Sequence, residues 1–103
     1  MIADTKSDLL LPGEDLVVQG LKDLAENRTT EHSLLLLLAA PRLRPLGVHI
    51  PNVPASEPFE HQLYDLLSIR FGDATHSHYN SLLRRINSYA HALEREQSSN
   101  NET

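Results

Sequence analysis

The sequence contains no cysteine, no tryptophan and only one methionine. Without cysteine, the chain has no disulfide framework, no thiol nucleophile and no Cys-ligated zinc or iron–sulfur site. Long apolar runs are also missing, because the longest one, residues 34–40, is far shorter than the roughly 20 residues that span a bilayer. The first residues show no cationic region followed by an apolar stretch. We therefore expect a soluble cytoplasmic protein without a membrane segment.

Basic charge is scarce. Nine Lys and Arg residues face fourteen Asp and Glu residues, which gives a formal net charge of −5. A module that binds nucleic acid or a membrane surface normally carries a basic patch, because phosphate contacts supply much of its affinity. The charge therefore disfavours direct binding to nucleic acid, including binding by a helix-turn-helix module.

Leucine is abundant, with 19 residues against four valines and four isoleucines. This composition favours helix, since leucine loses less rotamer freedom in a helix than β-branched residues do. The 103 residues fit one small domain. We expect an all-α fold of about four helices with a long C-terminal helix. We also expect a homodimer, because oligomerisation often supplements a small core.

The polar ends of the chain set the expected domain bounds, with a flexible arm at 1–8, one helical domain at 9–97 and a flexible tail at 98–103. The first helix is predicted over 12–27, with Pro12 in its first turn. Gly20 lies on its apolar stripe, where a close-packed neighbour is plausible.

A second helix is predicted to follow Thr29 or Thr30 as N-cap. Its five leucines, residues 34–38, are apolar all around a helix, so we expect burial on most sides. Pro41 restricts the residue before it, which predicts a helix end at Ala40. One short helical turn closed by a glycine can follow within 41–47.

Residues 48–57 contain two prolines and are predicted to be an extended connector. A third helix then begins with Ser56 or Glu57 as N-cap and Pro58 near its first turn, and Gly72 ends it. Its expected face consists of Phe59, Leu63, Leu66, Leu67 and Arg70.

The last helix is predicted to follow Asp73 or Thr75 as N-cap and to end near Glu96. Five of its residues are spaced 3-4-3-4, as in the a and d positions of a coiled coil. We call them the seam: Tyr79, Leu82, Ile86, Tyr89 and Leu93. The seam is either the core face of a bundle helix or a surface for a second protomer or partner. Its two tyrosines favour the partner surface, and we name the seam as the candidate interface.

The histidines and serines form no recognisable reactive motif. His76 and His78 make an H-x-H pair, but in a helix they diverge by about 200°, and only His61 and Glu57 remain as speculative further ligands. Ser77, His78 and Asp73 are neighbours in sequence, which does not make a triad. We therefore expect no catalytic residue, no metal site and no cofactor.

Two arginine pairs need separate interpretations. Arg42 and Arg44 lie between two prolines, and they bind either acids of their own chain, which is favoured, or an acidic partner. Arg84 and Arg85 are predicted on solvated flanks of the last helix, with Arg85 beside the seam.

Three stretches carry a resemblance to a known family: LAAPRLRPLG at 38–47, HQLYDLL at 61–67 and DATHSHYNSLLRRINS at 73–88. Over residues 9–95 the chain resembles the QslA-like quorum-sensing antiactivators. None of the three stretches is a functional signature, and the resemblance assigns no contact residues. It implies a dimer that binds the ligand-binding domain of the LuxR-type regulator LasR. Binding of this kind keeps the regulator from dimerising and from holding its promoters.

The resemblance therefore implies an inhibitory interaction protein whose partners are LasR and a second copy of itself. An adaptor or structural homodimer with another protein partner is the alternative. A small metal-dependent or His-dependent enzyme is the rival from another class.

Overall fold

The computed structural model describes the backbone of residues 11–102 and the side chains of residues 11–97, so the predicted arm at 1–8 lies outside the described residues. The described part is helical throughout its regular structure, which confirms the all-α class and the long C-terminal helix. Its elements are α2 (Glu14–Ala25), α3 (Glu31–Leu43), the 3-10 turn η1 (Arg44–Leu46), α4 (Phe59–Phe71), the 3-10 turn η2 (Gly72–Ala74) and α5 (Thr75–Glu102).

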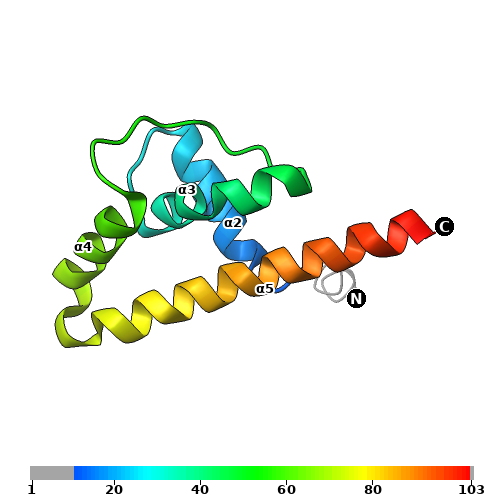
Figure 1. Ribbon diagram of the computed structural model, residues 1–103. Coiled ribbons are helices and arrows are strands. Elements are labelled where there is room, and N and C mark those ends of the chain that lie inside the picture. The colour runs from blue at the N-terminus through cyan, green and yellow to red at the C-terminus, as the bar shows by residue number, and fades with distance from the viewer. Residues whose placement is uncertain (1–10, 103) are drawn as a thin grey trace, which may run out of the picture.

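Helix α3 is the centre of the bundle, since α2, α4 and α5 all pack against it. Figure 1 shows α5 running beneath the other helices, with the connector between α3 and α4 arching over the opposite side. The 28 residues of α5 span about 42 Å at 1.5 Å per residue. This helix therefore accounts for most of the longest dimension of the molecule, 45 Å.

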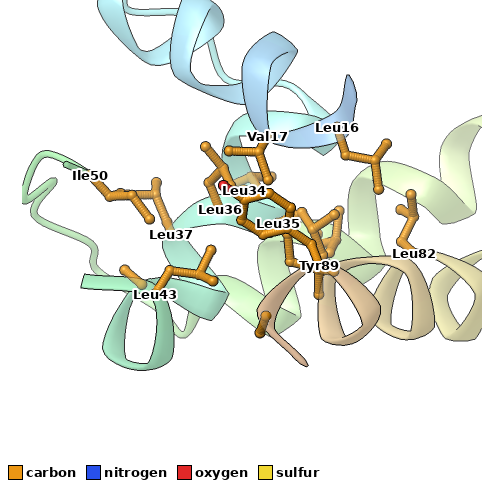
Figure 2. Packing of buried hydrophobic residues seen from close by; sticks show 14 of the residues in the cluster. Leu16, Val17, Leu34, Leu35, Leu36, Leu37, Leu43, Ile50, Leu82 and Tyr89 are labelled. Atoms are coloured by element: carbon orange, nitrogen blue, oxygen red, sulfur yellow. The ribbon is translucent and has the colours of Figure 1, made fainter. Parts of the chain in front are cut away.

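The leucine run of α3 supplies the middle of the core. Leu34, Leu35, Leu36 and Leu37 are at most 7% exposed, and Leu38 is half-buried. Burial on most sides is therefore confirmed. Figure 2 shows these leucines meeting side chains of α2, of the connector and of α5. The other buried apolar residues are Leu16, Val17, Ala40, Leu43, Ile50, Leu63, Leu67, Leu82, Ile86, Tyr89 and Ala90.

Two glycines let α2 approach its neighbours closely. A Cβ atom at Gly20 would lie 2.7 Å from the carbonyl oxygen of His32 and 2.8 Å from the Leu36 side chain. At Gly13, where φ is +80°, a Cβ atom would lie 2.6 Å from the carbonyl oxygen of Arg85. The close-packed neighbour expected at Gly20 is thus present, and it is α3.

Helix α2 is shorter than predicted at both ends. Gly13 is its N-cap, so Pro12 precedes the helix instead of occupying its first turn. At the other end, Asn27 adopts a left-handed φ of 58°, and the Arg28 N–H donates to the Asp23 carbonyl at 2.8 Å. This chain reversal closes the helix before the predicted end at residue 27.

The start of α3 is as predicted, but its end is not. Thr30 is the N-cap, and its side chain and backbone exchange hydrogen bonds with Ser33 in a capping box. The helix continues past Ala40, through Pro41, to Leu43. The prediction of an end at Ala40 is wrong because Leu43 is completely buried and its packing favours three more helical residues. The expected short turn then follows as η1, with Gly47 as its C-cap at φ 98°.

The connector has no regular structure, as predicted. Helix α4 begins at Phe59, which is later than a cap at Ser56 or Glu57 would place it. Pro58 occupies the N-cap position without a side-chain hydrogen bond, so neither Ser56 nor Glu57 caps the helix. Gly72 follows the last helical residue with a φ of 53°, which confirms the predicted stop.

Helix α5 begins at Thr75 and continues beyond Glu96 to Glu102. The Thr75 hydroxyl donates to the Gly72 carbonyl at 2.6 Å and so joins η2 to the new helix. Near the other end, the Gln97 side-chain amide donates to the Leu46 carbonyl of η1. The predicted end near Glu96 is therefore wrong, and the residues assigned to a tail, 98–102, belong to α5.

Candidate protein-binding surface

Most of the seam lies inside the chain's own core. Leu82, Ile86 and Tyr89 are 5%, 3% and 8% exposed, and burial raises the pKa of the Tyr89 hydroxyl. The core interpretation accounts for these three residues. Tyr79 and Leu93 are half-buried at the edge of the core, and the interface interpretation stays a prediction for them.

The exposed edge of the seam is an aromatic contact between α4 and α5. Tyr64, which is 37% exposed, meets Tyr79 edge-on with ring centroids 5.2 Å apart. Burial is the main reason that the pKa of the Tyr79 hydroxyl is raised. This contact joins two helices of one chain and leaves little of Tyr79 for a partner.

The connector is fixed at both ends and free between them. At its start, Ile50 is buried, and Arg44 donates to the carbonyls of Ile50 and Pro51 at 2.9 and 3.1 Å. At its end, the Gln62 amide donates to the Glu57 carbonyl at 2.9 Å. Residues 52–56 are exposed and make no hydrogen bond to another described residue. Their backbone groups are therefore open to a partner.

Hollows with apolar floors lie along the connector and the first half of α4. One, of about 420 Å³, lies between α3 and the connector, and a second, of about 210 Å³, lies beside the end of α2. Both include Leu37, Val53 and Phe59. A third, of about 320 Å³, shares Leu34 with the second and reaches Ile69 on α4.

We call the surface around these hollows the connector face and define it by Leu34, Leu37, Val53, Phe59 and Ile69. Its rim is apolar and accessible, since Val53 is 40% and Ile69 82% exposed. Apolar floors with a few exposed apolar side chains are typical of surfaces that bind another protein. The connector face is therefore the candidate functional site.

We did not predict this surface from the sequence, although the sequence contains one signal of it. Ile69 is a large apolar residue outside the stripe that α4 turns toward the core, and α4 has no second apolar face to bury it. The accessibility of Leu34 and Leu37 from the hollows had no such signal. A leucine run predicts burial, and only the path of the connector over α3 leaves space beside it.

The two histidines of the H-x-H pair diverge, as predicted. His76 points to Tyr64, with ring centroids 6.5 Å apart, whereas His78 stacks on Phe71 at 4.0 Å. Within residues 11–97 no three potential metal-ligating side chains come together. In the same range, the sequence neighbours Ser77 and Asp73 are exposed and make no hydrogen bond to His78.

Glu31, in the first turn of α3, is a buried carboxylate. It is 8% exposed, and its two oxygens receive the Arg70 guanidinium and, at 3.2 Å, the Nε2 atom of His78. Arg70 also covers the ring of Phe71, with 5.1 Å from the guanidinium carbon to the centroid. The cluster joins the start of α3 to the end of α4 and the start of α5. Its geometry indicates a structural role, because it satisfies a buried charge.

A second buried carboxylate stabilises the turn between α2 and α3. Asp23 is 3% exposed and accepts hydrogen bonds from the Thr30 hydroxyl at 2.6 Å and the Gln19 amide at 3.0 Å. The Thr30 hydrogen bond is the main cause that lowers the pKa of Asp23. Thr30 thus caps α3 and anchors α2 with the same hydroxyl.

Of Arg42 and Arg44, only Arg42 contacts an acid of its own chain, which was the favoured interpretation of this pair. Arg42 contacts Glu94 at 3.6 Å, while Arg44 holds connector carbonyls instead of an acid. Arg85 pairs with Asp15 at 2.8 Å beside the seam, and Arg84 is exposed. Arg42 and Arg85 thereby attach α5 to α3 and to the start of α2.

Among the described helices, none combines the length and the apolar character needed to cross a bilayer. Comparisons with protein-family models, with curated proteins and with solved structures found no match for this chain.

Proposed function

We propose that this chain is a non-catalytic sequestering protein that binds the ligand-binding domain of a LuxR-type regulator, LasR. Two independent observations support the proposal. The stretches at 38–47, 61–67 and 73–88 resemble the QslA-like antiactivators. The connector face has hollows with apolar floors, and two of its apolar side chains, Val53 and Ile69, are exposed.

The connector face is the observation that carries the proposal. Val53 lies beside α3 in a connector whose two ends are fixed at Ile50 and at Glu57. Apolar side chains of the regulator would fill the hollows over Leu37 and beside Phe59. Anchors buried in pockets of this kind provide most of the affinity of protein interfaces.

Sequestration then follows from competition. A regulator surface that is occupied by the connector face is no longer free to pair with a second regulator subunit. Such a mechanism needs only tighter binding to the antiactivator than to the twin subunit, and it uses no chemical step. Loss of the regulator dimer in turn weakens its hold on two-fold symmetric promoter sites.

A charge placed on the rim of the connector face tests the proposal. Val53→Glu alters an exposed connector residue, and Ser88→Glu, on the exposed side of α5, is the control because Ser88 lies outside the connector face and outside α2. Calorimetric titration with the LasR ligand-binding domain should show at least tenfold weaker binding for Val53→Glu and no change for Ser88→Glu. Equal affinities for the unmodified chain and Val53→Glu would contradict the assignment of this face.

Homodimerisation is a separate part of the proposal, and Val18 favours it. Val18, the half-buried Leu21 and the exposed Ala25 share one side of α2 at helical spacing. We propose that a second copy of the chain covers this side. Sedimentation of Val18→Glu should then show a monomer where the unmodified chain is a dimer. A dimer that binds no regulator would leave the alternative function, an adaptor homodimer with another protein partner.

A further inference from the structure

The third hollow of the connector face has a chemistry of its own. We call it the α4 hollow, and its volume is about 320 Å³. Its apolar floor and rim come from Leu34, Leu66 and Ile69, and Ile69 is 82% exposed. The polar residues that line it are Thr29, Ser56, Glu57, Gln62 and Asp65.

Two carboxylates in the α4 hollow have no cation beside them. The side chains of Glu57 and Asp65 make no hydrogen bond or ion pair with another described residue, and no Lys, Arg or His lines the hollow. Elsewhere in the described chain, Asp15, Glu26, Glu31 and Glu94 each pair with an arginine, whereas the exposed acids Glu60, Asp73 and Glu96 stand apart from one another and outside the α4 hollow.

The two neighbouring hollows, unlike the α4 hollow, each include an arginine. The one between α3 and the connector includes Arg44, and the one beside the end of α2 includes Arg28. The α4 hollow therefore combines an apolar surface with uncompensated negative charge. The ligand that matches this combination has an aliphatic stem and a cationic head.

We propose that the α4 hollow receives an arginine side chain of the protein partner. The inference rests on the proposed function in that it gives the chemistry of one contact at the connector face. The methylene groups of the arginine would lie on Leu66 and Ile69, and its guanidinium would reach Glu57 and Asp65. Arginine suits the hollow better than lysine, because its planar fork of five N–H donors can serve carboxylates from two different elements at once.

Polar groups at the edge of the α4 hollow add to its two carboxylates. The hydroxyls of Thr29 and Ser56 and the Gln62 carbonyl provide further acceptors at its edge. An incoming guanidinium therefore finds partners for the N–H groups that the carboxylates leave unused.

Acetyl-arginine amide is the probe for the hollow itself, and acetyl-citrulline amide is its neutral control. Titration of the ¹⁵N-labelled chain with the arginine probe should shift the amide resonances of Glu57, Asp65 and Ile69, whereas citrulline should leave them unchanged. The double variant Glu57→Gln/Asp65→Asn should lose the response, and Asp73→Asn, an exposed acid outside the hollow, should keep it. Equal shifts with both probes, or shifts confined to other residues, would overturn the proposal.

Binding to the regulator separates this inference from the proposed function. Glu57→Gln/Asp65→Asn should weaken binding of the LasR ligand-binding domain at least tenfold, and Asp73→Asn should leave it within twofold. If the regulator binds the double variant as tightly as the unmodified chain, the arginine contact is refuted and the proposed function stands. If the arginine probe binds the hollow and the regulator does not bind at all, the contact chemistry stands and the proposed function fails.

Discussion

Gly20 determines how closely α2 approaches α3. Its backbone lies where any side chain would meet both the His32 carbonyl and the Leu36 side chain. Glycine within a helix normally costs about 1 kcal/mol relative to alanine. The close packing of the two helices therefore has to outweigh an unfavourable local preference.

A glycine-to-alanine change within a helix usually stabilises a protein, but we expect Gly20→Ala to destabilise this one. We expect the free energy of unfolding to fall by about 1–3 kcal/mol, because the added methyl group overpacks the contact with α3. Urea unfolding followed by circular dichroism measures the change, and Lys22→Ala, at an exposed position of α2, should stay within about 0.5 kcal/mol of the unmodified chain. A more stable Gly20→Ala protein would show that the two helices are not in close contact.

Asp23 makes stability depend on pH. The hydrogen bond from Thr30 lowers the pKa of Asp23 below its ordinary value of 3.8. A lowered pKa in the folded state means that the ionised carboxylate stabilises the fold above the ordinary value. That contribution disappears as the pH falls through the folded-state pKa.

The free energy of unfolding should therefore decline as the pH falls below roughly 5, and Asp23→Asn should make the decline shallower. Part of the decline should remain because of Asp15. Burial raises the pKa of Asp15, but the hydrogen bond and charge of Arg85, together with hydrogen bonds from the backbone at the start of α2, lower it by more. Chemical unfolding at a series of pH values gives both slopes. Identical slopes for the variant and the unmodified chain would remove Asp23 from the account.

At this scale, the sequence predicts roles that depend on local pattern and misses roles that depend on burial. Gly20 stands on the apolar stripe of its helix, so a close neighbour could be anticipated. Glu31 and Asp23 look like ordinary surface acids. The partners of Glu31, Arg70 and His78, come from positions 39 and 47 residues away. The partners of Asp23 are Gln19 and Thr30, from the two helices that its turn joins.

At the scale of the element, the capping box of α3 links helix formation to tertiary structure. Thr30 accepts the Ser33 N–H at 3.1 Å and donates to Asp23 at 2.6 Å. Its neighbour Thr29 is exposed and makes no side-chain hydrogen bond to another described residue. Of these two adjacent threonines, only Thr30 therefore stabilises the fold through side-chain hydrogen bonds to described residues.

Thr30→Ala should lower the melting temperature because it removes the cap, which contributes about 0.5–2 kcal/mol, and leaves Asp23 with one partner fewer. Thr29→Ala should have little effect, and Thr30→Ser should recover most of the loss. Thermal unfolding of the three variants measures this order. Equal losses in Thr29→Ala and Thr30→Ala would show that the cap does not act as described.

Ile86 distinguishes the two interpretations of the seam at the level of α5. It is 3% exposed, so Ile86→Asp should destabilise the single chain by about 3–5 kcal/mol, through lost packing and a buried charge. Ser88→Asp, on the exposed side of the same helix, should leave stability almost unchanged. The measurement is denaturant unfolding of both variants. A stable, folded Ile86→Asp monomer that has lost only association would instead assign the seam to an interface.

Helix boundaries show where local signals were sufficient. Gly72 ends α4 as predicted, because glycine adopts a positive φ without the steric cost that a Cβ atom adds in other residues. Pro41 predicted a helix end that does not occur, because the burial of Leu43 outweighs the local preference. Signals within a few residues predicted the start of α3 and the end of α4, but they misplaced both ends of α2 and the ends of α3 and α5.

At the scale of the whole molecule, the division between core and binding surface differs from the one that periodicity suggested. The 3-4-3-4 spacing of α5 predicted correctly that one face of the helix is apolar and contacts other helices. It did not distinguish contacts within the chain from contacts with a partner, because both bury the same side chains. The connector face depends on the path of an irregular segment, for which the sequence has no periodic signal.

Stability and partner binding depend on two different sets of residues. The seam, the leucine run and the buried carboxylates hold one chain together. The connector face, with Val53 and Ile69 exposed, is left for a partner. Variants at Val53 and Ile69 should therefore keep their stability and lose binding, whereas variants of the seam, or of Leu34 and Leu37 in the leucine run, should lose stability first.

Light scattering behind size exclusion, on the chain alone and mixed with the LasR ligand-binding domain, tests the central claim most directly. We expect a new peak that contains both proteins and a matching loss of the regulator dimer. Two independent peaks, with the regulator still dimeric, would contradict sequestration and leave a helical protein that binds another partner.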